Sequence, residues 1–471
     1  MIKVLLENKM PWLILLIHVI LGVSSTLSPI PVIVWFYLVI FSSLHYLLKK
    51  TPSPILLIAT ILYLVSFELL ARMARTSPFI PYELGKYLLL AGMVWAILMN
   101  KTVGYLGWVM LICLIPAVFI DVSGIVSRDD LVFNLLGPVN VALVVIVFYK
   151  QKISLSNFSS LIRLMIYPII GVLAFTFIKS PEFDQVEFSL GANSDWSGGF
   201  GSNQVSTLFG LGALMLFILM INRWKFSGFF ILDAVFLFGF VFQGLLTFSR
   251  GGMLGAVVGI FIILFYLRTS EYRERQKYNL PKVGKYVLPA IFFAASAYIV
   301  VDELTGGMLS LRYAGETAGT LQGSKIKSFN TVTTGRLDIF LGDVDLWLDH
   351  FFFGVGAGAS GSLRETMEGA AAHVELSRLL AEHGLLGLIY FVVLCWLGFK
   401  LLRENPNPMV RGILVAFFTV AIYTTFHAAM RTFVSPALIG LSLLAVNLPK
   451  TNPVKRKPQG SSKQKVLVRV K

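Results

Sequence analysis

An arginine lies between two long apolar runs, in the segment GLLTFSRGGMLG. A charged side chain is expensive to bury at membrane depth, so Arg250 is a candidate functional residue. The flanking Ser249, Gly251 and Gly252 leave backbone amides free where the next helix starts, and such amides favour an anion. An arginine that only anchors the helix at the membrane interface is the alternative. The favoured interpretation is an anion-binding site.

A second arginine, Arg336, directly follows the sequence TTG and begins an amphipathic stretch. Its guanidinium group can bind a phosphate group through two parallel hydrogen bonds. A salt bridge with Asp338 or Asp343 is equally compatible with the sequence. Both interpretations stay open.

A histidine stands near the start of AAHVELSRLLAEHGLLGL. The small residues before His373 leave its ring accessible, and an imidazole with a pKa near 6.5 accepts a proton from a hydroxyl group at neutral pH. His373 is therefore a candidate general base. Packing is the alternative, as it is for His18 and His45 in the first two apolar segments.

Three charged residues follow at helical spacing. Glu375 and Arg378 are three positions apart, and Arg378 and Glu382 are four apart, so they form an ion ladder if this segment is helical. The ladder is typical of structural support. Because Glu375 and Arg378 lie so close to His373, they are also candidate substrate-binding residues.

Two more polar residues, His427 and Arg431, lie one helical turn apart near the end of an apolar segment and are further candidates for the site. Two glycine-rich stretches, at 197–202 and 354–361, lack the lysine of a phosphate-binding loop. No nucleotide site is expected. Cys113 and Cys395 stand far apart inside apolar runs, so neither a metal site nor a disulfide framework is expected.

The composition indicates which elements must position these residues. Of 471 residues, 56% are hydrophobic and 14% are charged, whereas soluble domains have roughly 25% charged residues. We predict an all-α, polytopic transmembrane helical bundle with about 14 helices. The spans are expected at roughly 10–26, 30–48, 54–71, 86–100, 104–121, 131–149, 160–178, 204–222, 227–248, 251–267, 285–301, 384–400, 410–428 and 432–449.

Lysine and arginine follow every even-numbered segment, which predicts cytoplasmic termini by the positive-inside rule. The same rule explains the net charge of +15 without a nucleic-acid partner. We expect one integral membrane domain, 1–449, and a basic, disordered cytoplasmic tail, 450–471. Chemistry would take place on the outer side, where the long hydrophilic loop 302–383 lies.

Within that loop, Gly335–His350 and Met367–His383 are expected to form short amphipathic helices at the membrane interface. One set of cations breaks the charge rule, because Arg72, Arg75 and Lys86 fall on a predicted outward loop. Either a helix is miscounted there, or these side chains bind an anion. In the second case Arg72 and Arg75 belong to the same pocket as Arg250.

Four motifs occur in order: TFSRGG, TGR, DHFFFGVGAG and AAHVELSRLLAEHGLLGL. Together they resemble the O-antigen ligase and polymerase superfamily of bacterial membrane glycosyltransferases, over roughly residues 195–400. The segment GGFGSNQVSTLFGLGAL, which contains Asn203, is similar to the family's segment before the arginine helix. The family often has an asparagine soon after the histidine, whereas Glu375 stands there in this chain.

The resemblance implies an enzyme of the bacterial cytoplasmic membrane that needs no metal or other cofactor. It would move a glycan from a polyprenyl-pyrophosphate carrier to an acceptor hydroxyl of a glycan, lipid or protein, with inversion at the anomeric carbon. Arg250 and Arg336 would bind the pyrophosphate, and His373 would activate the acceptor. Ligases and polymerases share these motifs, so both activities stay open.

Two other classes of function compete with the transferase. A transporter of lipid-linked glycans should have many polar residues deep in its helices and often an internal repeat, and the sequence has few of the former and no clear repeat. A scaffold without catalysis would leave the outward arginines and histidine unexplained.

Overall fold

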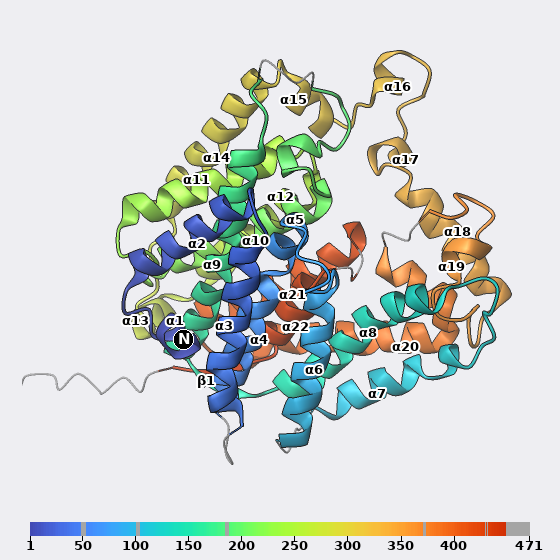
Figure 1. Ribbon diagram of the computed structural model, residues 1–471, viewed down its shortest axis with the longest axis horizontal. Coiled ribbons are helices and arrows are strands. Elements are labelled where there is room, and N and C mark those ends of the chain that lie inside the picture. The colour runs from blue at the N-terminus through green and yellow to red at the C-terminus, as the bar shows by residue number, and fades with distance from the viewer. Residues whose placement is uncertain are drawn as a thin grey trace, which may run out of the picture.

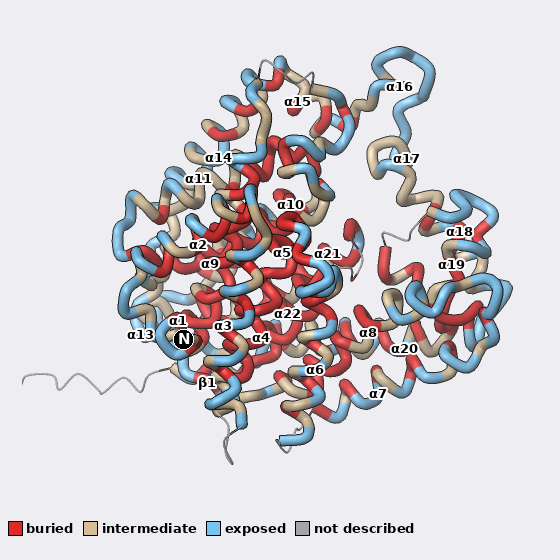
Figure 2. The backbone as a smooth tube through the Cα atoms, viewed as in Figure 1, coloured by how far each residue is buried: buried red, intermediate tan, exposed pale blue. Residues whose placement is uncertain are grey.

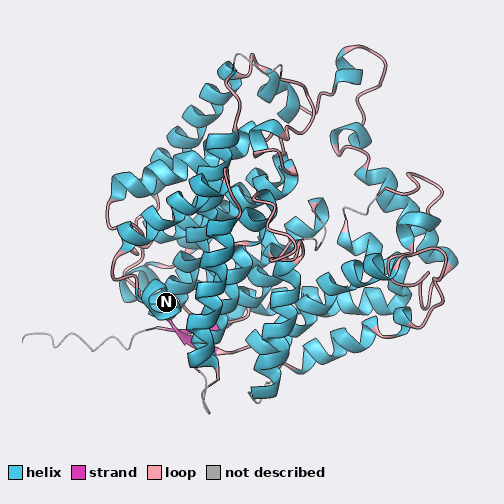
Figure 3. Cartoon of the chain, viewed as in Figure 1, coloured by secondary structure: helices cyan, strands magenta, loops and turns pink. Residues whose placement is uncertain are grey.

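The computed structural model describes residues 1–48, 53–99, 104–183, 188–370, 374–428, 430 and 432–448. Its regular structure is almost entirely helical (Figures 1 and 3). The first half contains α1 (Ile2–Glu7), α2 (Pro11–Ser25), α3 (Ile30–Leu47), α4 (Pro54–Ser66), α5 (Glu68–Met73), α6 (Leu84–Met99), α7 (Tyr105–Leu114), η1 (Pro116–Val118), α8 (Arg128–Phe148), β1 (Lys152–Ser154), α9 (Leu155–Lys179), η3 (Asp195–Ser197) and α10 (Ser202–Ile221). The second half contains α11 (Phe230–Leu246), α12 (Arg250–Thr269), α13 (Tyr272–Lys277), α14 (Gly284–Leu304), α15 (Met308–Tyr313), α16 (Ala318–Leu321), α17 (Phe329–Val332), α18 (Arg336–Asp349), α19 (Ser360–Leu363), α20 (Glu375–Glu404), α21 (Pro408–His427), α22 (Val434–Ser442) and β2 (Ala445–Asn447).

Within the described ranges, nine helices are long and apolar enough to cross a membrane, with α4 and α5 counted as one. The helices α2, α6, α7 and α11 are apolar but shorter. The predicted all-α polytopic bundle is confirmed, and each of the 14 expected segments coincides with a helix. The last one is shorter than expected, because the chain leaves α22 after Ser442 and forms β2.

The two short strands pair in parallel, with Ile153 opposite Val446. They precede α9 and follow α22, so they connect distant parts of the sequence at one end of the bundle (Figure 3). The far end of α9 lies at the other end of the bundle, near the start of α10. We call that second end, where α10 and α12 begin, the site end.

The buried residues concentrate in the middle of the bundle, in α4, α9, α10, α21 and α22 (Figure 2). By contrast, α14 exposes a large apolar face that includes Leu288, Ile291, Phe292 and Ile299, each at least 60% exposed. A helix with an exposed apolar face is stable only in apolar surroundings such as lipid. The pattern agrees with a membrane protein.

The long loop folds into short helices, α15 to α19, that extend from the end of α14 to the start of α20 (Figure 1). The predicted helix Gly335–His350 is confirmed as α18. The predicted helix Met367–His383 is wrong at its start, because Met367 and Gly369 have left-handed backbone angles, with φ of 57° and 73°. Helix α20 begins only at Glu375, and a break at Gly384, with φ of 61°, separates its first turns from the membrane-spanning part.

At the site end the backbones of α12 and α10 lie in close contact. A Cβ atom at Gly252 would collide with the backbone of Ser206 and Thr207. The Ser206 hydroxyl also donates to the Ser249 carbonyl at 2.6 Å. Only glycine permits this approach, so Gly252 determines how close the start of α12 lies to α10.

We predict that Gly252→Ala lowers the free energy of unfolding by about 1–3 kcal/mol, because the added methyl group forces two backbones apart. The measurement is the melting temperature of the purified protein in detergent. Gly284→Ala is the control, since a Cβ atom at Gly284 meets no atom within 4 Å. Equal melting temperatures for the two variants would contradict the prediction.

Candidate active site

The segment TFSRGG holds Arg250 at the site end. The Ser249 hydroxyl donates to Asn203 Oδ1 at 2.6 Å, which fixes the turn before α12 against α10. Arg250 is the first residue of α12 and reaches into the long loop. Its Nη1 donates to the Arg312 carbonyl at 3.1 Å and its Nη2 to the Val332 carbonyl at 2.6 Å. Arg250 therefore connects the bundle to two separate parts of the loop.

A third arginine, Arg312, lies beside it on α15. Asp302 near the end of α14 accepts hydrogen bonds from the Ser310 backbone nitrogen at 2.7 Å and the Ser310 hydroxyl at 2.6 Å, which fixes α15 against α14. The reversal between the two helices uses Gly306 and Gly307, whose φ angles of 61° and 80° favour glycine. Arg312 is buried, and its Nε donates to the Phe248 carbonyl at 3.3 Å.

Arg336 begins α18 and lies in the same cluster. Its Nη1 donates to the Thr333 carbonyl at 3.2 Å. Neither carboxylate considered from the sequence pairs with it, because Asp338 accepts from Asn330 and Asp343 pairs with Arg364. Arg336 therefore forms no salt bridge with Asp338 or Asp343.

The three arginines, which we call the arginine cluster (Arg250, Arg312 and Arg336), form no ion pair with any residue that the structure describes. Burial, together with the positive charges of Arg250 and Arg336, lowers the pKa of Arg312 to about 10. Burial and the charge of Arg250 also lower the pKa of Arg336. Arg312 nevertheless stays charged at neutral pH, so the cluster concentrates positive charge that a bound anion would neutralise.

Helix α21 contributes His427 and Tyr423 to the same place. A Cβ atom at Gly251 would lie 2.6 Å from His427 Nδ1, so the imidazole packs on the first turn of α12. The Tyr423 ring lies 5.2 Å from the His427 ring, and Tyr423 is near Arg250 and Arg336. The structure thus brings His427 to the cluster, whereas Arg431 lies outside the described residues.

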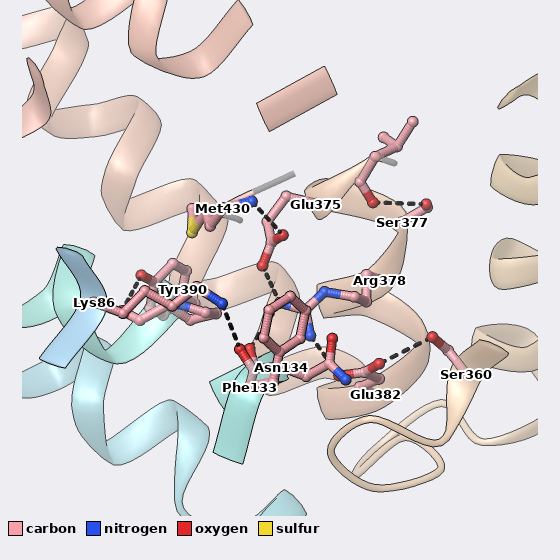
Figure 4. Close-up of polar contacts among 12 residues, drawn as sticks. Lys86, Phe133, Asn134, Ser360, Glu375, Ser377, Arg378, Glu382, Tyr390 and Met430 are labelled. Atoms are coloured by element: carbon pink, nitrogen blue, oxygen red, sulfur yellow. Dashed lines mark hydrogen bonds and ion pairs between the residues drawn. The ribbon is translucent and has the colours of Figure 1, made fainter. Parts of the chain in front are cut away.

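The ion ladder on the first turns of α20 is present as its spacing predicts (Figure 4). Arg378 pairs with Glu375 and with Glu382, the latter at 3.0 Å. Glu382 accepts from the Ser360 hydroxyl at 2.9 Å, and Glu375 accepts from the Met430 backbone nitrogen at 3.1 Å. The ladder is buried, and its carboxylates attach the first turns of α20 to Ser360 and Met430. A role of Glu375 and Arg378 in substrate binding stays a prediction.

A proline explains the third side-chain contact of Arg378, whose Nη2 donates to the Asn134 carbonyl at 3.0 Å (Figure 4). Pro138 lies four residues later within α8 and has no backbone N–H, so this carbonyl lacks its usual helical partner. The guanidinium group satisfies it instead. This places α20 against α8.

His373 lies outside the described residues, but the residues on both sides of 371–373 are fixed. Arg364 donates to the carbonyl of Ala370 and pairs with Asp343 at 3.5 Å, and both of these side chains are fully buried. Asp343 in turn accepts from the Ser377 hydroxyl at 2.7 Å. Helix α18, which carries Arg336, is therefore linked to the chain before and after His373.

The remaining predicted site residues lie nearby but not in the cluster. Asn203 contacts Ser249 rather than Arg250 itself. Arg72 is buried, pairs with Glu68, and donates to Gln204 Oε1 at 3.1 Å and to the Tyr82 carbonyl at 2.5 Å. Arg72 and Arg75 line a separate cavity of about 990 Å³ at the site end. The structure therefore does not bring Arg72 and Arg75 into one pocket with Arg250.

An apolar cavity of about 480 Å³ runs along α12 from the cluster. Residues of α10, α11, α12 and α14 line it, and Met253, Tyr298 and Tyr313 are among the residues that line it near the cluster. Tyr313 directly follows Arg312, and Met253 lies one turn after Arg250. The cavity and the cluster together offer an apolar compartment with a cationic end.

A comparison with family models matches residues 244–392 to the O-antigen ligase family. This segment is similar to an O-antigen ligase domain. It contains all three arginines of the cluster and begins in the last turn of α11, shortly before Arg250. No curated protein and no solved structure matches the chain. The resemblance to the O-antigen ligase superfamily is confirmed for this segment.

Sequence reasoning missed Arg312 and the two tyrosines of the candidate site. The signal for Arg312 was the pair Gly306–Gly307 followed by a short amphipathic segment, which indicates a reversal back onto the preceding helix. Tyr423 lies one turn before His427, so helical spacing alone places both on one face. Tyr313 offered no signal of its own in the sequence.

If Arg312 binds an anion as a cation, the affinity of the protein for inorganic phosphate should fall as the pH rises through about 10, where Arg312 loses its charge. In Arg312→Lys the fall should come at lower pH, because a lysine has an ordinary pKa of about 10.4 and meets the same burial and positive charges. The measurement is the pH profile of phosphate binding to the purified protein in detergent. Superimposed profiles would exclude Arg312 from anion binding.

Arg378→Met should lower the free energy of unfolding by about 3–5 kcal/mol, because it leaves two buried carboxylates without a counter-charge. Thermal unfolding in detergent tests this. Arg403→Met, on the same helix but exposed, is the control and should change little. A similar melting temperature for both variants would show that the ladder is not a structural support.

Proposed function

We propose that this protein is a glycosyltransferase that moves a glycan from a polyprenyl-pyrophosphate carrier to an acceptor hydroxyl group. The observation that carries the proposal is the cluster of three arginines, which have no carboxylate partner among the described residues and lie beside an apolar cavity, in the segment that matches the O-antigen ligase family. The donor has the matching chemistry, because it joins an apolar chain to a doubly phosphorylated head group.

The two parts of the donor fit the two compartments. The apolar cavity takes part of the prenyl chain, since almost all of its lining is hydrophobic. The pyrophosphate lies at the cluster, where guanidinium groups bind phosphate oxygens in pairs. The first-turn amides of α12 add to this, because Ser249 makes no side-chain cap to them and donates to Asn203 instead.

The reaction is a single displacement. The acceptor oxygen forms a bond to the anomeric carbon while the bond from that carbon to the pyrophosphate oxygen breaks. The electron pair stays on the carrier pyrophosphate, whose developing charge the three arginines stabilise. The anomeric configuration is inverted. Arginine supplies the positive charge in this scheme, so no metal ion is assigned a step.

The proton of the acceptor hydroxyl goes to His373 in this proposal. Two features support it. Small residues precede His373 in the sequence and leave its ring accessible. Buried contacts of Arg364 and Asp343 also hold the residues on both sides of 371–373. An imidazole takes up the proton as the new bond forms and releases it to water afterwards. His427 contacts α12 and is assigned the role of helping to orient the pyrophosphate.

The site end faces the outer side of the bacterial cytoplasmic membrane in this proposal, and both termini face the cytoplasm. The supporting observation is the distribution of lysine and arginine after α3, α6, α8, α10 and α12. Two of the three outward cations also have carboxylate partners. Arg72 pairs with Glu68, and Lys86 with Glu83 at 3.7 Å, so neither adds a free charge to that side.

The test is reconstitution in liposomes with a polyprenyl-pyrophosphate oligosaccharide and candidate acceptors, followed by sizing of the products. A single addition identifies a ligase, and a ladder identifies a polymerase. Movement of labelled donor across the bilayer without any product would identify a transporter and overturn the proposal.

We expect Arg250→Gln and Arg336→Gln each to lower the transfer rate about 10²–10³-fold, as the loss of one stabilising group in a transition state does. The rate of single-turnover transfer with saturating donor is the measurement. Arg128→Gln is the matched control, since Arg128 is an exposed arginine outside the cluster. Unchanged rates in both cluster variants would exclude this site.

His373→Ala should abolish transfer while donor binding, followed by tryptophan fluorescence, stays intact. Transfer at the full rate in this variant would remove the base assignment. Loss of both binding and transfer would instead assign His373 to the donor site.

A further inference from the structure

A second cavity, of about 990 Å³, lies at the site end and does not include the arginine cluster. Four segments enclose it: the α2–α3 turn, the end of α5 with the residues after it, the end of α9, and the segment before α10. Its volume is at the upper end of the roughly 300–1,000 Å³ of small-molecule sites, so it has room for an oligosaccharide.

The lining combines three kinds of group. Tyr82 and Phe200 present aromatic rings, whose centroids lie 6.4 Å apart. Thr26, Ser28 and Ser77 present hydroxyl groups. Aromatic faces and hydroxyl groups together suit sugar rings, which have apolar C–H faces and a polar edge.

The charge of the cavity comes from two exposed cations. Arg72 is neutralised by Glu68 and all its contacts are internal. Arg75 and Lys179 are exposed and form no ion pair with a described residue, while Asp195 is the one acid among the lining residues that the structure describes. The balance favours an anionic group on the ligand.

Arg75 also occupies a backbone position that disfavours a side chain. It follows α5 with φ of 56°, and its backbone nitrogen donates to the Arg72 carbonyl at 3.1 Å. Helices often end with glycine in this left-handed conformation, because a Cβ atom there is unfavourable. An arginine at this position places a cation in the cavity lining at the expense of stability.

Short contacts connect this cavity to the arginine cluster. Arg72 in the cavity wall donates to Gln204 at 3.1 Å, and the adjacent Asn203 accepts from Ser249, which precedes Arg250. A glycan chain in the cavity thus lies beside the segment that holds the cluster.

We propose that this cavity binds a saccharide segment that carries carboxylate or phosphate groups. The proposal rests on the proposed glycan transfer only for the source of the saccharide, which is either the acceptor or the glycan of the donor. Binding itself is independent of turnover, so the two proposals fail separately.

The first experiment measures binding to the full-length protein in detergent, with a trimer of galacturonic acid and a trimer of galactose as probes. The acidic trimer should bind more tightly than the neutral one. Arg75→Gly should weaken binding of the acidic trimer about threefold to fivefold, as expected for one solvent-exposed charge pair, and adding Lys179→Gln should weaken it further. Arg75→Gly should also raise the melting temperature, since it relieves the left-handed backbone.

Arg223→Gly is the matched control. Arg223 follows α10 at the opposite end of the bundle, is exposed, and has φ of 55°. This variant should gain stability in the same way and bind the acidic trimer like the unmodified protein. Equal affinity for both trimers, or an unchanged affinity in Arg75→Gly, would overturn the proposal. So would binding of phosphatidylglycerol vesicles that depends on Arg75 in the absence of trimer binding, because the site would then be a lipid headgroup site.

The second experiment identifies the source of the saccharide in the reconstituted transfer reaction. A higher KM for an acidic acceptor alone in Arg75→Gly assigns the cavity to the acceptor. A higher KM for the donor alone assigns it to the donor glycan. Unchanged KM values for both, with trimer binding lost, would overturn a role of the cavity in the reaction.

Discussion

The close backbone contact between α12 and α10 is the constraint on which the site depends. Gly252 lets the two helices approach, and the hydrogen bonds of Ser249 to Asn203 and Ser206 fix the turn before α12. Arg250 then projects from a rigid end of the bundle into the loop. Because Arg250 donates hydrogen bonds to the carbonyls of Arg312 and Val332, the contact between α12 and α10 also determines where α15 and α17 lie.

The structure treats its buried cations in two ways. Arg72, Arg364 and Arg378 each pair with a carboxylate: Arg72 and Arg378 within their own helices, and Arg364 with Asp343 of α18. The arginine cluster has no such partner among the described residues. Pairing is the rule for a charge removed from water, so the absence of a partner distinguishes the cluster from the structural arginines more clearly than burial does.

Much of the fold follows from hydrophobic segments, because each apolar run must become a helix in lipid. Arg250 and Arg336 were also predictable, since glycines and threonines beside an arginine indicate a helix start. Arg312 was missed although Gly306 and Gly307 indicated a reversal, because its contact with the Phe248 carbonyl joins segments that only the fold brings together. The predicted start of the helix Met367–His383 was wrong for a similar reason, as hydrophobic spacing does not reveal the left-handed angle of Met367.

Pro138 and Arg378 act on the same carbonyl group although 240 positions separate them in the sequence. The proline leaves the carbonyl of Asn134 without a helical donor, and Arg378 donates a hydrogen bond to it. A residue other than proline at 138 would return that carbonyl to its own helix and leave the guanidinium group one acceptor short. The missing hydrogen bond in α8 thus provides the acceptor through which Arg378 attaches α20 to α8.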